Sequence, residues 1–270
     1  MSLKHKNYFD YWADVNPRLN SYLTANTNIK FIKALTDSIA FYSYISEDIG
    51  KKITRNKDIS PKLDLFLVFA LDQLRAALPL YTNLNLGPSA ICTRATFENL
   101  VTIRFIVKDS YPSLYADRYN RFKDITKLKA HKSSTFLRKL SPQDEQSILA
   151  ANPEWVDSTT GKLFKKTHWS AIYGMNFEQL VGRTNLKDYY SIYRTTSQFM
   201  HANSITVNMY SLNGGIRVMG SESHVRKFAS LTALFALETI KDYSDFFGVN
   251  VDAETYHGII KPLHDLVTET

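Results

Sequence analysis

Apolar residues recur at intervals of three and four along most of the chain, which is the period of an α-helix with one buried face. This period predicts a first long helix over 29–49. The next two segments begin at Ser60-Pro61 and at Gly87-Pro88 and are apolar on nearly all sides. A helix that is apolar all round is buried, so we expect these two helices at the centre of the fold.

The remaining helical patterns are shorter or more polar. They cover 111–131, 189–204 and 252–266. Two more are a segment that begins with the capping sequence at 141–144 and a stretch that runs from 222 to a stop at Gly248. Three stretches depart from the helical period. We expect 1–28 to form a polar lead-in and 152–176 to form an irregular arm. Two β-prone pieces flank Asn213-Gly214-Gly215, which favours a turn between two strands.

These patterns predict an all-α fold: a helical bundle with a small β-hairpin insert near 205–220, built as a single domain over residues 1–270. Composition supports this expectation, because 44% of the residues are hydrophobic and both glycine (10) and proline (8) are scarce. Aromatic residues reach 13%, so several tyrosine hydroxyls must find partners inside the core.

The net charge bears on which partners the protein could bind, and the cysteine content bears on its cellular compartment. Lys and Arg number 33 against 26 Asp and Glu, a net charge of +7, which permits a polyanionic partner such as RNA without requiring one. The basic run over 118–132 is expected to be a solvated helix face. The single cysteine, Cys92, excludes an intrachain disulfide and fits a reducing compartment, so we expect a cytoplasmic protein.

Membrane, metal and cofactor sites are not expected from the sequence. The longest apolar run, 65–71, lies between Asp64 and Asp72 and is far too short to span a bilayer. No set of histidines, cysteines and carboxylates has the spacing of a metal site. The chain also lacks a glycine-rich phosphate loop.

The first candidate site is a pair of opposite charges four residues apart, Arg94 and Glu98, on a helix predicted to be buried. Thr102 extends the same stripe. An exposed pair at this spacing is worth only about 0.3–0.5 kcal/mol, whereas buried charges are costly unless they are hydrogen-bonded or functional. The pair is therefore either a structural ion pair or part of a binding site. Trp169, in the irregular arm, is a further candidate binding residue.

The second candidate is a polar stripe formed by Tyr190, Arg194, Ser197 and His201. Their offsets of four, seven and eleven residues stack them on one side of a helix. A histidine can move a proton near neutral pH, and an arginine on the same face can hold a phosphate. Ser197 and Tyr190 can orient both groups. The alternative is a hydrogen-bonded structural seam.

Two blocks of the chain resemble a widespread bacterial family of helical domains in which no activity is settled. The block 93–107 is similar to the helix of that family that carries an Arg and a Glu four residues apart. The block 168–204 is similar to its Trp and its tyrosine-rich helix, where Ser197 and His201 match a Ser and a His four residues apart. The resemblance implies a helical fold and a set of positions, but no reaction.

A looser resemblance links Arg194 and His201 to the HEPN superfamily, whose signature is an Arg followed after four to six residues by a His on one helix. It implies metal-independent RNA cleavage, with His201 as general base on the ribose 2′-hydroxyl and Arg194 stabilising the charge on phosphorus. It also implies a role in phage defence or toxicity, a homodimer in which each helix contributes its motif, and an antitoxin or another protein partner. Thr195 matches only in part the polar residue that often follows the Arg in HEPN sequences.

Three functions therefore stay open at the level of sequence. The chain is a ribonuclease, or a non-catalytic helical binding or scaffold module, or a sensor that binds an anionic ligand such as a nucleotide through Arg94 and Arg194.

Overall fold

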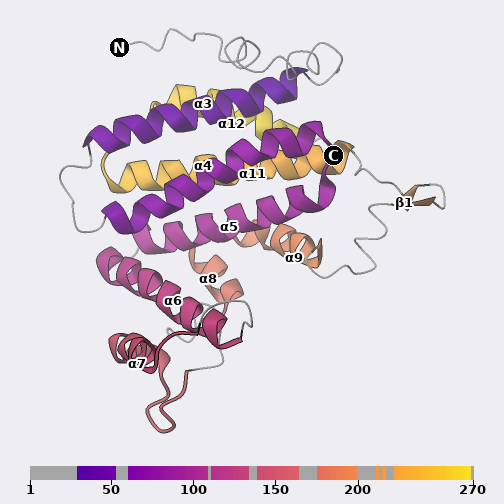
Figure 1. The fold of residues 1–270 in the computed structure, drawn as a ribbon. Coiled ribbons are helices and arrows are strands. Elements are labelled where there is room, and N and C mark those ends of the chain that lie inside the picture. Colours follow the sequence, from indigo (N-terminus) through magenta and orange to yellow (C-terminus); the bar gives the residue numbers. More distant parts are fainter. Residues whose placement is uncertain are drawn as a thin grey trace.

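The computed structural model describes residues 29–52, 60–108, 111–133, 139–163, 175–199, 211–212, 215–216 and 222–268. Five long helices lie roughly side by side in the upper part of Figure 1: α3 (Ile29–Lys52), α4 (Ser60–Thr82), α5 (Leu86–Lys108), α11 (Glu222–Phe246) and α12 (Ala253–Thr268). The long helix α6 (Pro112–Ser133) lies below α5. Shorter elements lie along and below α5: α7 (Pro142–Ala151), η2 (Pro153–Trp155), α8 (Phe177–Arg183), η4 (Lys187–Tyr189) and α9 (Tyr190–Gln198).

The helical fold class is confirmed, and several helix ends lie where the sequence placed them. The Ser141 side chain accepts a hydrogen bond from the Asp144 amide at the start of α7, as its capping sequence predicts. Gly248 has a φ of 67° and follows the end of α11. This left-handed conformation is easily adopted by glycine and ends the helix there.

Strand structure within the described residues is limited to one short antiparallel pair, β1 (Ser211–Leu212) and β2 (Gly215–Ile216). It falls inside the segment predicted to form a hairpin insert. The rest of 205–220, including the turn, lies outside the described residues, so the hairpin stays a prediction. The helix predicted over 189–204 begins instead with the 3-10 turn η4, and its described part ends near residue 199.

The core is organised around α11, which packs most extensively against α5 and α4 and also touches α3 and α12. Small residues let α5 and α11 approach closely. At this contact Thr93 Oγ1 lies 2.9 Å from the Phe228 carbonyl oxygen and 3.0 Å from Thr232 Oγ1, so buried hydroxyls satisfy one another and the backbone. Larger side chains such as Phe97 and Phe235, with ring centroids 5.1 Å apart, fill the same layer.

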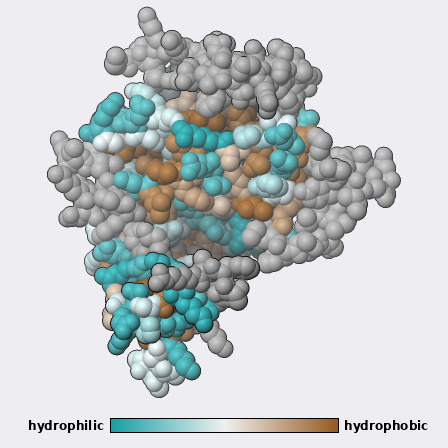
Figure 2. All heavy atoms as spheres, viewed as in Figure 1, coloured by the Kyte–Doolittle hydropathy of each residue, from teal (hydrophilic) through white to brown (hydrophobic). Residues whose placement is uncertain are grey.

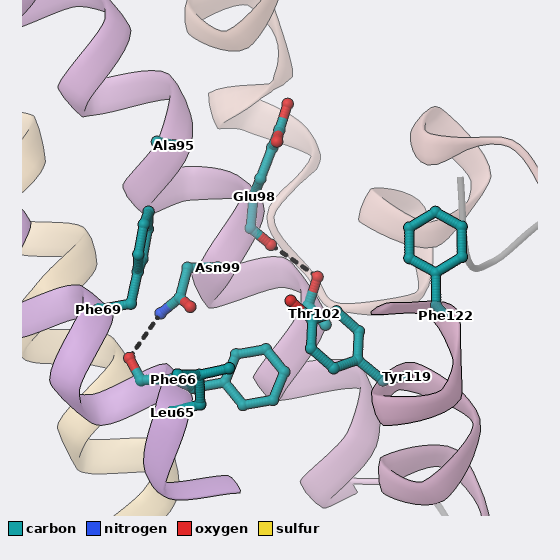
Figure 3. A pocket seen from close by; sticks show the side chains of 9 residues that line it. All are labelled: Leu65, Phe66, Phe69, Ala95, Glu98, Asn99, Thr102, Tyr119 and Phe122. Atoms are coloured by element: carbon teal, nitrogen blue, oxygen red, sulfur yellow. Dashed lines mark hydrogen bonds between the residues drawn. The ribbon is translucent and has the colours of Figure 1, made fainter. Parts of the chain in front are cut away.

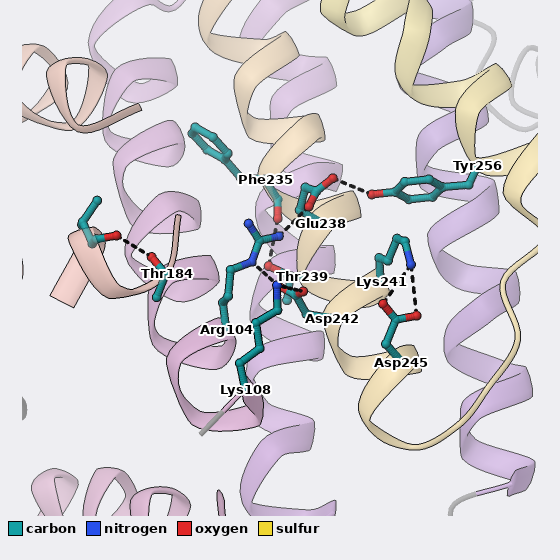
Figure 4. Close-up of polar contacts among 11 residues, drawn as sticks. Arg104, Lys108, Thr184, Phe235, Glu238, Thr239, Lys241, Asp242, Asp245 and Tyr256 are labelled. Atoms are coloured by element: carbon teal, nitrogen blue, oxygen red, sulfur yellow. Dashed lines mark hydrogen bonds and ion pairs between the residues drawn. The ribbon is translucent and has the colours of Figure 1, made fainter. Parts of the chain in front are cut away.

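A buried ion cluster joins α5, α11 and α12 (Figure 4). Arg104 is 8% exposed and donates from Nε to Asp242 and from Nη2 to Glu238, each at 2.5 Å. The Tyr256 hydroxyl donates to the other Glu238 oxygen at 2.8 Å, and Lys108 lies 3.5 Å from Asp242. Burial raises the pKa of Asp242, while the positive charge of Arg104 opposes that rise. The cluster therefore ties three helices together at the cost of burying two charges.

The outer face of α4 is partly apolar. Leu65 and Val68 are 48% and 57% exposed. Figure 2 shows apolar patches among polar ones on the face where α4 lies in front. In the part of the chain that the structure describes, no helix combines the length and the hydropathy that a membrane crossing requires.

Candidate functional site

Arg94 and Glu98 form the ion pair that their spacing predicts, with Arg94 Nε 3.0 Å from Glu98 Oε1. The pair does not lie in the bundle interior. The side chains of Arg94 and Glu98 are 25% and 39% exposed. Most of α5 is buried, but this pair lies on the edge of the helix that faces α9. The two charges are therefore only partly shielded from water, at the side of α5 that α9 packs against.

The pair contacts α9 through Tyr193. Arg94 Nη2 donates to the Tyr193 hydroxyl at 3.3 Å, and the guanidinium carbon lies 5.1 Å from the centroid of the Tyr193 ring. Burial, and then the negative charge of Glu98, raise the pKa of Tyr193, so its hydroxyl stays protonated and able to donate. Burial alone would lower the pKa of Arg94, but the Glu98 contact outweighs it and raises that pKa.

Aromatic rings extend this contact along α9 and onto α8. Tyr190 stacks on Tyr193 with centroids 5.7 Å apart and an interplanar angle of 19°. The ring of Phe177, at the start of α8, lies 4.6 Å from Tyr193. Burial, followed by the charge of Glu178, raises the pKa of Tyr190. These contacts place a ladder of rings beside the Arg94–Glu98 pair.

The predicted polar stripe is only partly described. Arg194 is exposed and Tyr190 is half-buried. Ser197 Oγ donates to the Tyr193 carbonyl of its own helix at 2.6 Å. His201 and Trp169 lie outside the described residues, so their roles stay predictions. Within the described part of the chain, the Arg94–Glu98 pair meets α9 through Tyr193.

A pocket of about 350 Å³ opens between α4, α5 and α6, next to this contact (Figure 3). It is lined by Leu65, Phe66, Phe69, Ala95, Glu98, Asn99, Thr102, Tyr119 and Phe122. The Glu98 carboxylate is turned away from Asn99 in Figure 3, while the Glu98 backbone carbonyl accepts a hydrogen bond from Thr102 Oγ1 at 2.8 Å. Glu98 therefore belongs to both the pocket and the α5–α9 contact.

Sequence reasoning missed Tyr193, Asn99 and the ion cluster around Arg104. Tyr193 lies one turn after Tyr190, so a search for partners of Arg94 on that helix could have included it. For Arg104 a signal existed on the partner helix, where Glu238 and Asp242 stand four residues apart in an apolar segment. Asn99 gave no signal, since an isolated amide in an apolar helix does not reveal what lies opposite. Among the described residues, no group of histidines, cysteines and carboxylates could hold a metal ion.

Residues 64–215 match DUF5677, a family of unknown function. The chain belongs to this family. No curated protein and no solved structure matches the chain. The matched region runs from α4 to β2 and contains the α5–α9 contact, the pocket and both blocks that resemble a helical bacterial family. No named relative supports the HEPN resemblance, and membership in the family fixes neither a substrate nor a reaction.

Proposed function

We propose that the protein is a metal-independent endoribonuclease in which Arg194 and His201 act together. The observation that carries this proposal is the exposure of Arg194 on α9, on the same stripe as Tyr190 and ahead of His201 in the sequence. An exposed guanidinium can hold an RNA phosphate through two hydrogen bonds. The neighbouring tyrosine rings suit the stacking of an unpaired base.

The reaction follows from these groups. The His201 imidazole takes the proton of a ribose 2′-hydroxyl, and the 2′-oxygen attacks the adjacent phosphorus. Arg194 stabilises the negative charge that grows on the phosphate oxygens. The 5′-oxygen leaves and takes a proton from water or from a second imidazole, which leaves a 2′,3′-cyclic phosphate. A homodimer would bring two such motifs together. A role of the nuclease in phage defence or toxicity would require a protein antitoxin that covers these motifs.

The test is an RNA cleavage assay with and without EDTA. Arg194→Ala is expected to slow cleavage by about 10²–10³-fold and His201→Ala by about 10²–10⁴-fold, and EDTA should have no effect. Arg183→Ala removes another exposed arginine, from the end of α8, and serves as the matched control with unchanged activity. No cleavage by the wild-type protein, or inhibition by EDTA, would rule the nuclease out.

A non-catalytic scaffold is the second candidate, and the contacts of Ser197 and Arg94 favour it. The Ser197 hydroxyl donates a hydrogen bond to the backbone of its own helix. Contacts among Arg94, Glu98 and Tyr193 join α5 to α9. In that role Tyr193→Phe would destabilise the protein, and the wild type would not cleave RNA. The anion sensor has weaker support, because Arg94 is already engaged by Glu98.

A further inference from the structure

The pocket between α4, α5 and α6 has the walls of a site for a flat ring. Its volume of about 350 Å³ lies near the lower end for small-molecule sites, which begin at about 300 Å³. Figure 3 shows Phe69 and Phe122 on opposite sides, with Asn99 and Tyr119 between them. The Tyr119 ring packs against Phe66 with centroids 4.7 Å apart. Aromatic walls favour a planar aromatic ligand, which gains stacking contacts on its faces.

Asn99 offers this ligand a donor and an acceptor side by side. The residue is only 9% exposed, and its Nδ2 donates to the Phe66 carbonyl at 3.1 Å. Because only the nitrogen of the amide can donate, this contact fixes the orientation of the amide group. One N–H then remains for a ligand, and no described residue hydrogen-bonds Asn99 Oδ1. Because Asn99 lines the pocket, this remaining donor and acceptor are available to a ligand there.

The charges around the pocket favour a neutral ligand over an anion. No lysine or arginine is among its lining residues, and Glu98 is the only charged one among them. Burial, and then the charge of Glu98, raise the pKa of Tyr119, so the phenol remains neutral. A phosphate in this pocket would meet the Glu98 carboxylate and no cation among the lining residues.

We propose that this pocket binds an adenine ring, as the free base or as a nucleoside. An asparagine amide pairs in bidentate fashion with the amino group and the adjacent ring nitrogen of adenine. The rings of Phe69, Tyr119 and Phe122 hold the faces and edge of the base. This binding function goes beyond the RNA cleavage proposed above and does not rest on it, because none of the lining residues belongs to the Arg194 stripe.

The test is calorimetric titration of the full chain with adenosine, which should show saturable binding at one site per chain. Inosine carries an oxygen in place of the amino group, so its acceptor would face Asn99 Oδ1, and its affinity should be at least about tenfold lower. Adenosine monophosphate should bind no tighter than adenosine. Absence of saturable adenosine binding, or equal affinities for adenosine and inosine, would overturn the proposal.

Two neighbouring substitutions on α4 localise the site. Phe69→Ala removes one wall and should lower adenosine affinity by about tenfold. Val68→Ala removes an exposed apolar side chain from the next position, which does not line the pocket, and should leave the affinity unchanged. Thermal melts of both variants establish that each is folded. Equal losses in the two variants would place the adenosine elsewhere and overturn the assignment.

Discussion

At the scale of single residues, the two arginine–carboxylate contacts of α5 should contribute very differently to stability. Arg104 is buried against Asp242 and Glu238, whereas the Arg94–Glu98 pair is partly open to water. Arg104→Met leaves two carboxylates without their buried cation, so the free energy of unfolding should fall by about 3–5 kcal/mol. Glu98→Gln should cost less than about 1 kcal/mol. Urea unfolding of both variants measures this difference, and equal losses would contradict it.

The pH dependence of the Arg104→Met protein gives a second readout of the same prediction. Burial already holds the pKa of Asp242 above its ordinary value, and loss of Arg104 should raise it further. When a carboxyl group has a higher pKa in the folded than in the unfolded protein, the protein loses stability as the pH rises from the unfolded-state pKa through the folded-state pKa. The deficit of the variant should therefore shrink as the pH is lowered from 7 towards about 4. A deficit that stays constant over this range would place the lost energy in packing instead.

The same residues show how far sequence could reach. Spacing of four predicted the contact between Arg94 and Glu98, because i,i+4 neighbours on a helix are fixed by local geometry. It could not predict the exposure of that pair, since exposure depends on where α9 lies. Arg104 and its partners are more than 130 residues apart along the chain, so only the packing of α5 on α11 brings them together.

At the scale of elements, α8 is a short helix whose start is fixed by a reciprocal cap. Asn176 Oδ1 accepts from the Gln179 amide, and Gln179 Oε1 accepts from the Asn176 amide, each at 2.9 Å. Seven residues are too few for a helix that is stable by itself, so α8 depends on this cap for much of its stability. Asn176→Ala should lower the free energy of unfolding by about 1 kcal/mol.

This cap also positions Phe177, the first residue of α8, against Tyr193. Amide hydrogen exchange should therefore become faster in both α8 and α9 of the Asn176→Ala protein, while exchange in α12 stays unchanged. Protection that is lost only at the first turn of α8 would mean that α9 does not depend on it. The long helices needed no such contacts to be predicted, because their apolar periods run over four or more turns.

At the scale of the whole molecule, the family match and the packed core do not coincide. The match ends at residue 215, yet α11 begins after it and is buried along most of its length, with Leu234, Phe235 and Ile240 in the core. Periodicity predicted α11 as a helix, but nothing in its sequence indicated that α4 and α5 would both pack against it.

A chain of residues 64–215 would therefore expose the apolar faces of α4 and α5 that α11 covers. At about 25 cal/mol per Å² of apolar surface, this loss exceeds the net stability of an ordinary domain. We expect the 64–215 fragment to lack a cooperative thermal transition by circular dichroism. A chain of residues 29–270, which keeps every helix described, should melt cooperatively and serves as the control. Cooperative melting of the 64–215 fragment near the transition of the control would show that the matched region folds independently of α11.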